Sequence, residues 1–189
     1  MTDAPRVNAV GDLELTDPAA MRALAEHTRL ALYDRVRRGP ATAAALAAAL
    51  GEPESVVQAH LSELESFGLV SQDADEWSSP ARGFVVEIPD DPEGQAAARE
   101  LTTVMMVSYD DLPSRWVDES EPRLGLEWAR AAGLFNARVT LTTDELRSVQ
   151  DGLERLLEPF LTREAGAAPA EARDVRILSY FLPEPDAEV

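Results

Sequence analysis

In the first forty positions, apolar residues recur at the spacing of a helix, and turn-forming residues interrupt this pattern. Between residues 19 and about 38 the spacing is three or four, which predicts helix, and His27-Thr28 is a break that divides it into two helices. Asp17-Pro18 is typical of a helix start, because it places a cap before a proline in the first turn. Gly39-Pro40 ends the segment.

Two further helices are predicted on either side of a tight turn. Thr42 is a capping residue for an alanine-rich helix over 43–50, and Gly51 suits the left-handed residue that closes it. After the turn at 52–54, a helix over about 53–67 carries one narrow apolar stripe formed by Val57, Leu61 and Leu64. The opposite face holds small or uncharged side chains, namely Ser55, Gln58, Ala59, Ser62 and Ser66.

Residues 69–72 and 83–88 have the composition of two strands around a polar loop that contains Arg82. Short helices, a tight turn, a third helix and a hairpin are the parts of a winged helix-turn-helix. We therefore predict this domain over residues 16–90, with residues 1–15 as a tail that orders only in part.

The second half predicts an accessory region over residues 91–182, followed by a tail over 183–189. A long helix from Glu93 to about Leu112 has an apolar side that needs a partner, which suggests a dimerisation helix. Residues 113–122 are acidic and irregular, and 124–134 fit a further helix. Strands over 137–141 and 175–181 enclose an amphipathic helix from the capping box at Thr142 to about Leu161. The predicted fold class is α+β, with a small β-α-β accessory domain.

Composition limits the chemistry of the chain. It has no cysteine and two histidines, which excludes thiol chemistry and leaves little imidazole for a metal site. The net charge of -18 disfavours DNA binding, and it is spread over both halves of the chain. Residues 1–90 contain 7 arginines and 15 carboxylates, and residues 91–189 contain 10 arginines and 20 carboxylates. Lysine is absent. No apolar run is long enough to cross a bilayer and the N-terminus lacks an export pattern, so we expect a soluble cytoplasmic protein without membrane contact.

Three segments that follow one another along the chain, over 23–33, 39–47 and 57–70, together resemble the ArsR-like winged-helix regulators. The resemblance is carried by Arg29-Leu30, Thr42, His60-Leu61, Leu64-Glu65 and Gly68-Leu69-Val70. It implies a transcriptional regulator that binds double-stranded DNA as a homodimer, with the helix over 53–67 in the major groove of a promoter operator. The second half is similar to the accessory region of some actinobacterial members of this group.

The resemblance places Ser55, Gln58, Ala59 and Ser62 on the groove-facing side of that helix and Arg82 on the wing. Glutamine pairs with adenine, serine donates to bases or phosphate, and alanine contacts a thymine methyl. Arg37 and Arg38, with Arg35, form the basic cluster that can reach phosphate, and Thr42 opens the middle helix. The alternatives are a merely solvated helix face and ordinary capping by the arginines.

The surroundings of this face depart from the family. Glu52 and Glu54 stand at the turn, and Asp73, Asp75 and Glu76 stand in the wing, where basic residues are usual. His60 fits the edge of the core better than a base contact, and His27 fits a cap. The arsenic or zinc sensing of metal-binding relatives should not be transferred, because their cysteines and clustered histidines are missing.

The sequence bears on three further functions. Aromatic residues in the second half suggest a pocket for a small-molecule effector, with ordinary core as the alternative: Trp116, Trp128, Phe135, Phe160, Tyr180 and Phe181. We expect no enzyme and no cofactor, because the nucleophile elbow, the phosphate loop and the dinucleotide fingerprint are missing. The competing function is an acidic winged-helix module that binds another regulator, or mimics DNA, instead of binding DNA.

Overall fold

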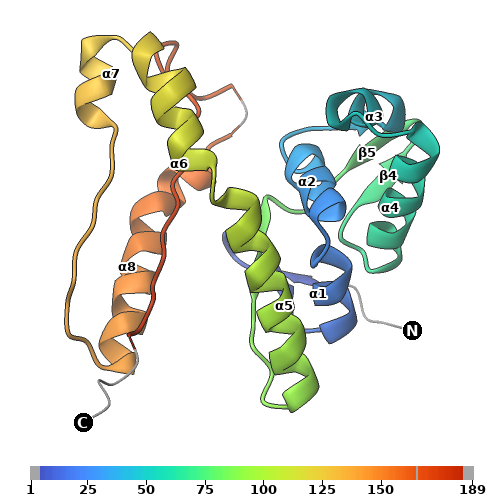
Figure 1. The fold of residues 1–189 in the computed structure, drawn as a ribbon, viewed down its shortest axis with the longest axis horizontal. Coiled ribbons are helices and arrows are strands. Elements are labelled where there is room, and N and C mark those ends of the chain that lie inside the picture. The colour runs from blue at the N-terminus through green and yellow to red at the C-terminus, as the bar shows by residue number, and fades with distance from the viewer. Residues whose placement is uncertain (1–4, 165, 185–189) are drawn as a thin grey trace. The chain divides into compact units, whose positions relative to one another are not determined.

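The computed structural model describes residues 5–164 and 166–184. The chain divides into two compact units, Met1–Thr142 and Thr143–Val189 (Figure 1). The first unit contains the small strands and most of the helices, and the second contains one long helix. The predicted α+β winged-helix class is confirmed for the first unit.

Helices α1 (Pro18–Leu24) and α2 (His27–Val36) are separated at the predicted break. The carboxylate of Asp17 accepts the amide of Ala19 at 2.9 Å and so caps α1. The cap of α2 is Glu26, whose two carboxylate oxygens accept the amides of Thr28 and Arg29 at 3.0 and 2.9 Å. The expectation that His27 is the cap was therefore wrong by one residue.

Helices α3 (Ala43–Leu50) and α4 (Glu54–Ser66) follow the prediction closely. The hydroxyl oxygen of Thr42 accepts the amide of Ala45 at 3.2 Å, and Gly51 has φ of 71°. A left-handed residue costs little only when it is glycine, so Gly51 ends α3 where the tight turn begins. Figure 1 shows α2, α3 and α4 grouped with the small strands β4 and β5.

The wing is shorter than predicted. Strands β4 (Ser71–Asp73) and β5 (Glu76–Ser78) form an antiparallel hairpin, and β3 (Ala41–Thr42) pairs with the outer side of β5. The hairpin turns at Ala74 and Asp75, where Ala74 has φ of 51°. The prediction that residues 83–88 form the second wing strand was wrong, because Glu76–Ser78 already occupies that place.

Residues 83–86 belong to a second sheet together with the N-terminus. Strand β2 (Asp12–Leu15) lies between β1 (Arg6–Val7), which is antiparallel to it, and β6 (Gly83–Val86), which is parallel. Leu13 and Leu15 point into the core and are each 1% exposed. The prediction of a partly ordered tail over 1–15 was therefore wrong for β1 and β2, because the alternation of polar and apolar residues in 12–15 is that of a half-buried strand.

Helix α5 (Pro92–Tyr109) packs against α1 in the same chain. Ala97, Ala98 and Leu101 are buried there and belong to the core of the first unit. A Cβ on Gly94 would lie 2.4 Å from the ring of Pro89, so this close approach requires glycine. Much of the apolar side that predicted a dimerisation helix is therefore covered within one chain.

The rest of the first unit consists of short helical turns. These are α6 (Leu112–Arg115), the π-helix η1 (Trp116–Ser120), the 3-10 helix η2 (Glu121–Arg123) and α7 (Leu126–Ala131). The prediction that residues 113–122 are irregular was therefore wrong, because short helical turns occupy them. The second unit holds α8 (Thr143–Leu161), which confirms the predicted amphipathic helix. Among the described residues, no helix has the length and hydropathy needed to span a membrane.

The β-α-β arrangement of the accessory region is not formed in the described chain. Residues 132–142 and 173–184 contain no strand, although 137–141 and 175–181 were predicted as strands. Val139, Val175 and Ile177 are exposed. A strand gains stability from a paired strand and a covered apolar face, and in these segments the apolar side chains stay exposed although the pattern alternates.

Candidate nucleic-acid interface

Helix α4 presents one exposed polar face. Val57, Leu61 and Leu64 are fully buried on its inner side, as the stripe predicted. The four residues expected to face a DNA groove are all exposed, and they follow one another at spacings of three, one and three: Ser55, Gln58, Ala59 and Ser62. This spacing places them on one side of the helix. The structure thus brings the predicted residues together on one surface.

Two elements hold α4 in position. It packs against α3 across the short turn and against α2 across the core. His60 lies on its partly buried edge, where Nδ1 is 3.9 Å from a carboxylate oxygen of Glu26. His60 is thus a core-edge residue, as expected, although it faces a carboxylate. Glu26 serves both helices, because it also caps α2.

The carboxylate of Glu26 is stabilised in the folded chain. Burial on its own raises the pKa of this group, but the backbone amides of Thr28 and Arg29 and the nearby His60 and Arg29 charges outweigh that effect. The pKa of Glu26 is therefore lowered from its ordinary value of 4.5. No sequence motif marked this residue, since glutamate is not among the preferred capping residues.

The basic cluster at the end of α2 is only partly available to a ligand. Arg37 donates to the Asp34 carboxylate at 2.7 Å and to the carbonyl of Arg82 at 3.2 Å. Arg38 is exposed, and Arg35 is exposed with one long contact of 3.5 Å to the carbonyl of Ala49. Phosphate contact from this cluster would therefore rest on Arg35 and Arg38 more than on Arg37.

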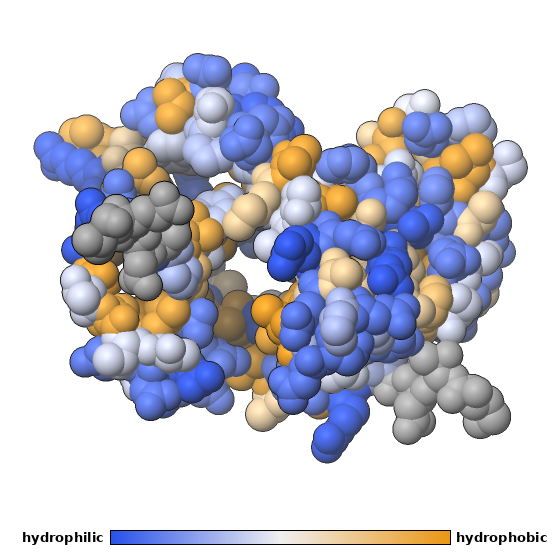
Figure 2. All heavy atoms as spheres, turned by 60° about the horizontal axis from the view of Figure 1, so that its bottom comes forward, coloured by the Kyte–Doolittle hydropathy of each residue, from blue (hydrophilic) through white to orange (hydrophobic). Residues whose placement is uncertain are grey.

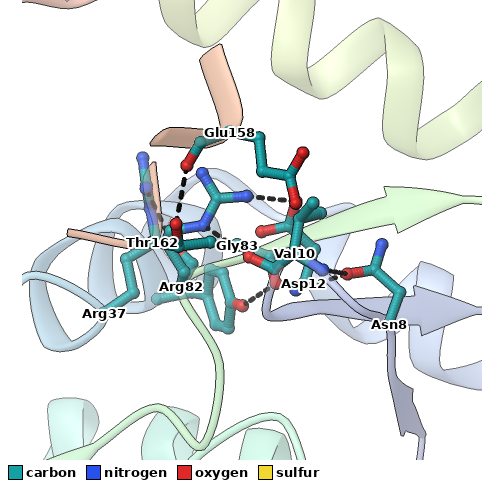
Figure 3. Close-up of polar contacts among 9 residues, drawn as sticks. Asn8, Val10, Asp12, Arg37, Arg82, Gly83, Glu158 and Thr162 are labelled. Carbon is teal, nitrogen blue, oxygen red and sulfur yellow. Dashed lines mark hydrogen bonds and ion pairs between the residues drawn. The ribbon is translucent and has the colours of Figure 1, made fainter. Parts of the chain in front are cut away.

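Arg82 is not on the wing. It lies after β5, in the segment that leads into β6, and its guanidinium donates to Asp12 at 2.8 Å and to the carbonyl of Val10 at 3.1 Å (Figure 3). The side chains of Arg82 and Asp12 are 31% and 17% exposed. The sequence placed Arg82 on the wing because the hairpin was expected to extend to residue 83. Its bonds are those of a residue that fastens β2 to β6.

The carboxyl group of Asp12 lies in a half-buried setting. Burial raises its pKa from the ordinary value of 3.8, and the charges of Arg82 and Arg37 act in the opposite direction. Arg82 is bonded to this carboxylate, whereas Arg37 is bonded to Asp34 and acts on Asp12 only through its charge. Both guanidinium groups are therefore less available to a DNA backbone than those of the exposed Arg35 and Arg38.

The wing carries a negative surface. Asp73, Asp75 and Glu76 are exposed on the β4–β5 hairpin, and Asp73 stands directly opposite Glu76 in the strand register. Like charges opposite one another destabilise a hairpin slightly. Glu52 and Glu54 at the turn before α4 are exposed as well. The surface around α4 is therefore acidic on two sides.

Thr42 lies at the start of α3 and is partly exposed. Its hydroxyl oxygen already accepts an amide hydrogen bond as a cap. A hydroxyl that accepts one bond can still donate its own hydrogen. A phosphate contact from Thr42 is therefore compatible with its structural role.

Two of the aromatic residues proposed for an effector pocket are open to solvent. Phe135 is 89% exposed and Phe160 is 63% exposed. Side chains this open to solvent do not line an enclosed cavity. Among residues 5–164 and 166–184, no three His, Asp or Glu side chains are grouped so that they could hold a metal ion.

Comparison with known families agrees with this geometry. Residues 24–73 match a family model described as a helix-turn-helix domain. The chain contains a helix-turn-helix domain. The match runs from the end of α1 to the end of β4, so it includes α4 and its exposed face. A helix-turn-helix domain of this kind indicates a DNA-binding regulator. No curated protein matches the chain.

Proposed function

We propose that this protein is a transcriptional regulator that binds promoter DNA as a dimer, with α4 in the major groove. The observation that carries the proposal is the stripe of four predicted residues on the exposed side of α4, within an acidic helix-turn-helix domain. The stripe itself holds no carboxylate, and Glu63 and Glu65 lie on its two flanks. In a chain of net charge -18, such a face is the surface where a polyanion meets least repulsion. The segments that resemble ArsR-like regulators support that subtype.

The side chains on this face match the chemistry of base edges. Gln58 can form two hydrogen bonds with adenine, and Ala59 can contact a thymine methyl group. Ser55 and Ser62 can donate to bases or to phosphate. Arg35 and Arg38 at the end of α2 would supply phosphate contacts, and Thr42 one more. We expect the protein to act by binding DNA rather than by catalysis, and to do so in the cytoplasm.

A selection experiment tests this proposal. Purified full-length protein is incubated with sheared genomic DNA from its source at low salt, and the bound fragments are sequenced. We expect reproducible enrichment of a few promoter fragments. The test variant is Gln58→Ala, which should lose that enrichment. Its matched control is Gln95→Ala, at the exposed start of α5, which should keep the enrichment. Absence of enrichment with the unchanged protein would refute the proposal.

A second candidate function is contact with another protein, and the acidic wing favours it. Asp73, Asp75 and Glu76 are exposed on the hairpin, and two arginines that could offset them are bonded inside the domain. A basic surface on another regulator would complement this wing. The same selection separates the two functions, because a protein-binding module enriches no DNA fragment.

A further inference from the structure

Among the described residues, the apolar side of α8 is a largely exposed surface. Five side chains recur at spacings of three, four, three and four, which is the a and d pattern of a coiled-coil seam: Leu146, Val149, Leu153, Leu156 and Phe160. We call them the α8 stripe. Leu146 and Leu153 are partly buried, whereas Val149, Leu156 and Phe160 are 47%, 67% and 63% exposed.

Between Leu146 and Phe160, the positions that flank the α8 stripe carry no charge, whereas Glu145 occupies the g position just before Leu146. Gln150, Gly152, Leu157 and Pro159 occupy the e and g positions between Leu146 and Phe160. The five carboxylates of α8 lie elsewhere, at its start or on its outer face: Asp144, Glu145, Asp151, Glu154 and Glu158. In a chain of net charge -18, only an uncharged surface allows another copy to approach closely.

Gly152 adds a second observation beside the stripe. It stands in the interior of α8, where glycine weakens a helix, and a Cβ there would meet no atom within 4 Å. The glycine is therefore not needed for packing inside the described chain. It leaves room for a second helix to approach the backbone of α8.

We propose that the α8 stripe is the surface through which two copies of this chain associate. The three-four repeat fits another helix that carries the same repeat. An anionic bilayer is a poor partner, because α8 carries five carboxylates and two arginines, a net charge of -3. This inference deepens the proposed function, because it names the surface that joins the two copies. It rests on that function in one respect: a dimer is needed to place two α4 helices on one operator.

Light scattering of the full-length protein, without DNA, tests the proposal. We expect a mass of about twice the 20.6 kDa of one chain at micromolar concentration. Leu156→Glu should return the mass of one chain, because it places a charge within the stripe. Ser148→Glu adds the same charge on the outer face of the same helix and should remain dimeric. Because Leu156 is largely exposed, the variant loses little packing, and an unchanged circular dichroism spectrum checks its fold.

Two results would overturn the proposal. One is a single-chain mass for the unchanged protein. The other is a dimer that persists in Leu156→Glu. If that dimer is instead lost in Val107→Glu, on the exposed side of α5, the two copies associate through α5. Because no DNA is present, these results stand apart from success or failure of the DNA selection.

Cross-linking gives an independent readout, because the chain has no cysteine of its own. Leu153→Cys introduces one thiol at the centre of the stripe, and a short bifunctional maleimide should join two copies there in high yield. Ser148→Cys, on the outer face, should give little cross-linked product. Equal yields from both variants would contradict association through the stripe.

Discussion

The guanidinium of Arg82 donates to the carboxylate of Asp12 at 2.8 Å, across the parallel pair of strands β6 and β2. The same arginine donates to the carbonyl of Val10, and its own carbonyl accepts from Arg37. Residues 10–15 are therefore joined to the winged domain by bonds as well as by the buried leucines of β2. An arginine that the sequence assigned to DNA is a structural residue.

Arg82→Ala should lower the free energy of unfolding by about 1–2 kcal/mol. This value lies between the contribution of an exposed ion pair and that of a hydrogen bond to a buried charge. Chemical denaturation measures it, and Arg38→Ala, at an exposed arginine, is the matched control with little expected change. Combining Arg82→Ala with Asp12→Ala should cost less than the two changes separately. An Arg82→Ala protein of unchanged stability but weakened DNA binding would place Arg82 in the interface after all.

Gln58→Ala should weaken binding to a selected promoter fragment while leaving stability unchanged, because the side chain is exposed on α4. A bidentate contact to adenine contributes about 1–3 kcal/mol, so the affinity should fall about 5- to 150-fold for each half-site. Fluorescence anisotropy with labelled DNA measures the loss. Gln95→Ala makes the same chemical change outside α4 and should bind normally. Equal affinities of the two variants would exclude Gln58 from base contact.

Neutralising the wing should strengthen DNA binding. The variant Asp73→Asn, Asp75→Asn, Glu76→Gln removes three charges beside the proposed phosphate backbone, and it also removes the like-charge pair across the hairpin. We expect a gain of roughly several-fold in affinity at low salt that shrinks as salt rises. If DNA binding is unchanged and a protein partner is lost instead, the wing is a protein-binding surface.

Stability should depend on pH through Glu26. Its pKa is lowered from 4.5 in the folded chain, so folding favours the carboxylate. The stabilisation is present above about pH 4.5 and is lost as the pH falls through the lower folded pKa. Glu26→Gln should cost about 1 kcal/mol at pH 7, by analogy with other capping residues, and the cost should shrink at acid pH. Denaturation of both proteins from pH 7 to pH 3 measures the difference, and a cost that does not vary with pH contradicts the assignment.

Local signals were enough to predict α1 to α4, the helices of the winged domain. Asp17-Pro18, Thr42 and Gly51 each act within one turn of chain, and the structure places caps and ends where these residues predicted them. The exposed face of α4 was predictable for the same reason, since burial of Val57, Leu61 and Leu64 determines which side remains outside.

The sheets depended on partners distant in sequence. Strand β2 pairs with β6 about 70 residues later, and four alternating residues are too few to reveal such a pairing. The wing turns at Ala74-Asp75 without the glycine or asparagine that marks most tight hairpins, so its end was misplaced. The wrong assignment of Arg82 to the wing followed from both errors, because its true role depends on where β5 ends and on the presence of Asp12.

The most direct test of DNA recognition is a salt titration of binding to a selected promoter fragment. The affinity of a DNA reader falls linearly, on logarithmic axes, with a slope of about -0.9 for each phosphate contacted. With few exposed arginines near α4, we expect specific binding at 50 mM salt and a shallow slope of about -2 to -4 for a dimer. Competition with unrelated DNA of equal length establishes the specificity. Equal affinity for both DNAs, or no binding at any salt, would contradict the assignment of this helix-turn-helix domain to DNA recognition.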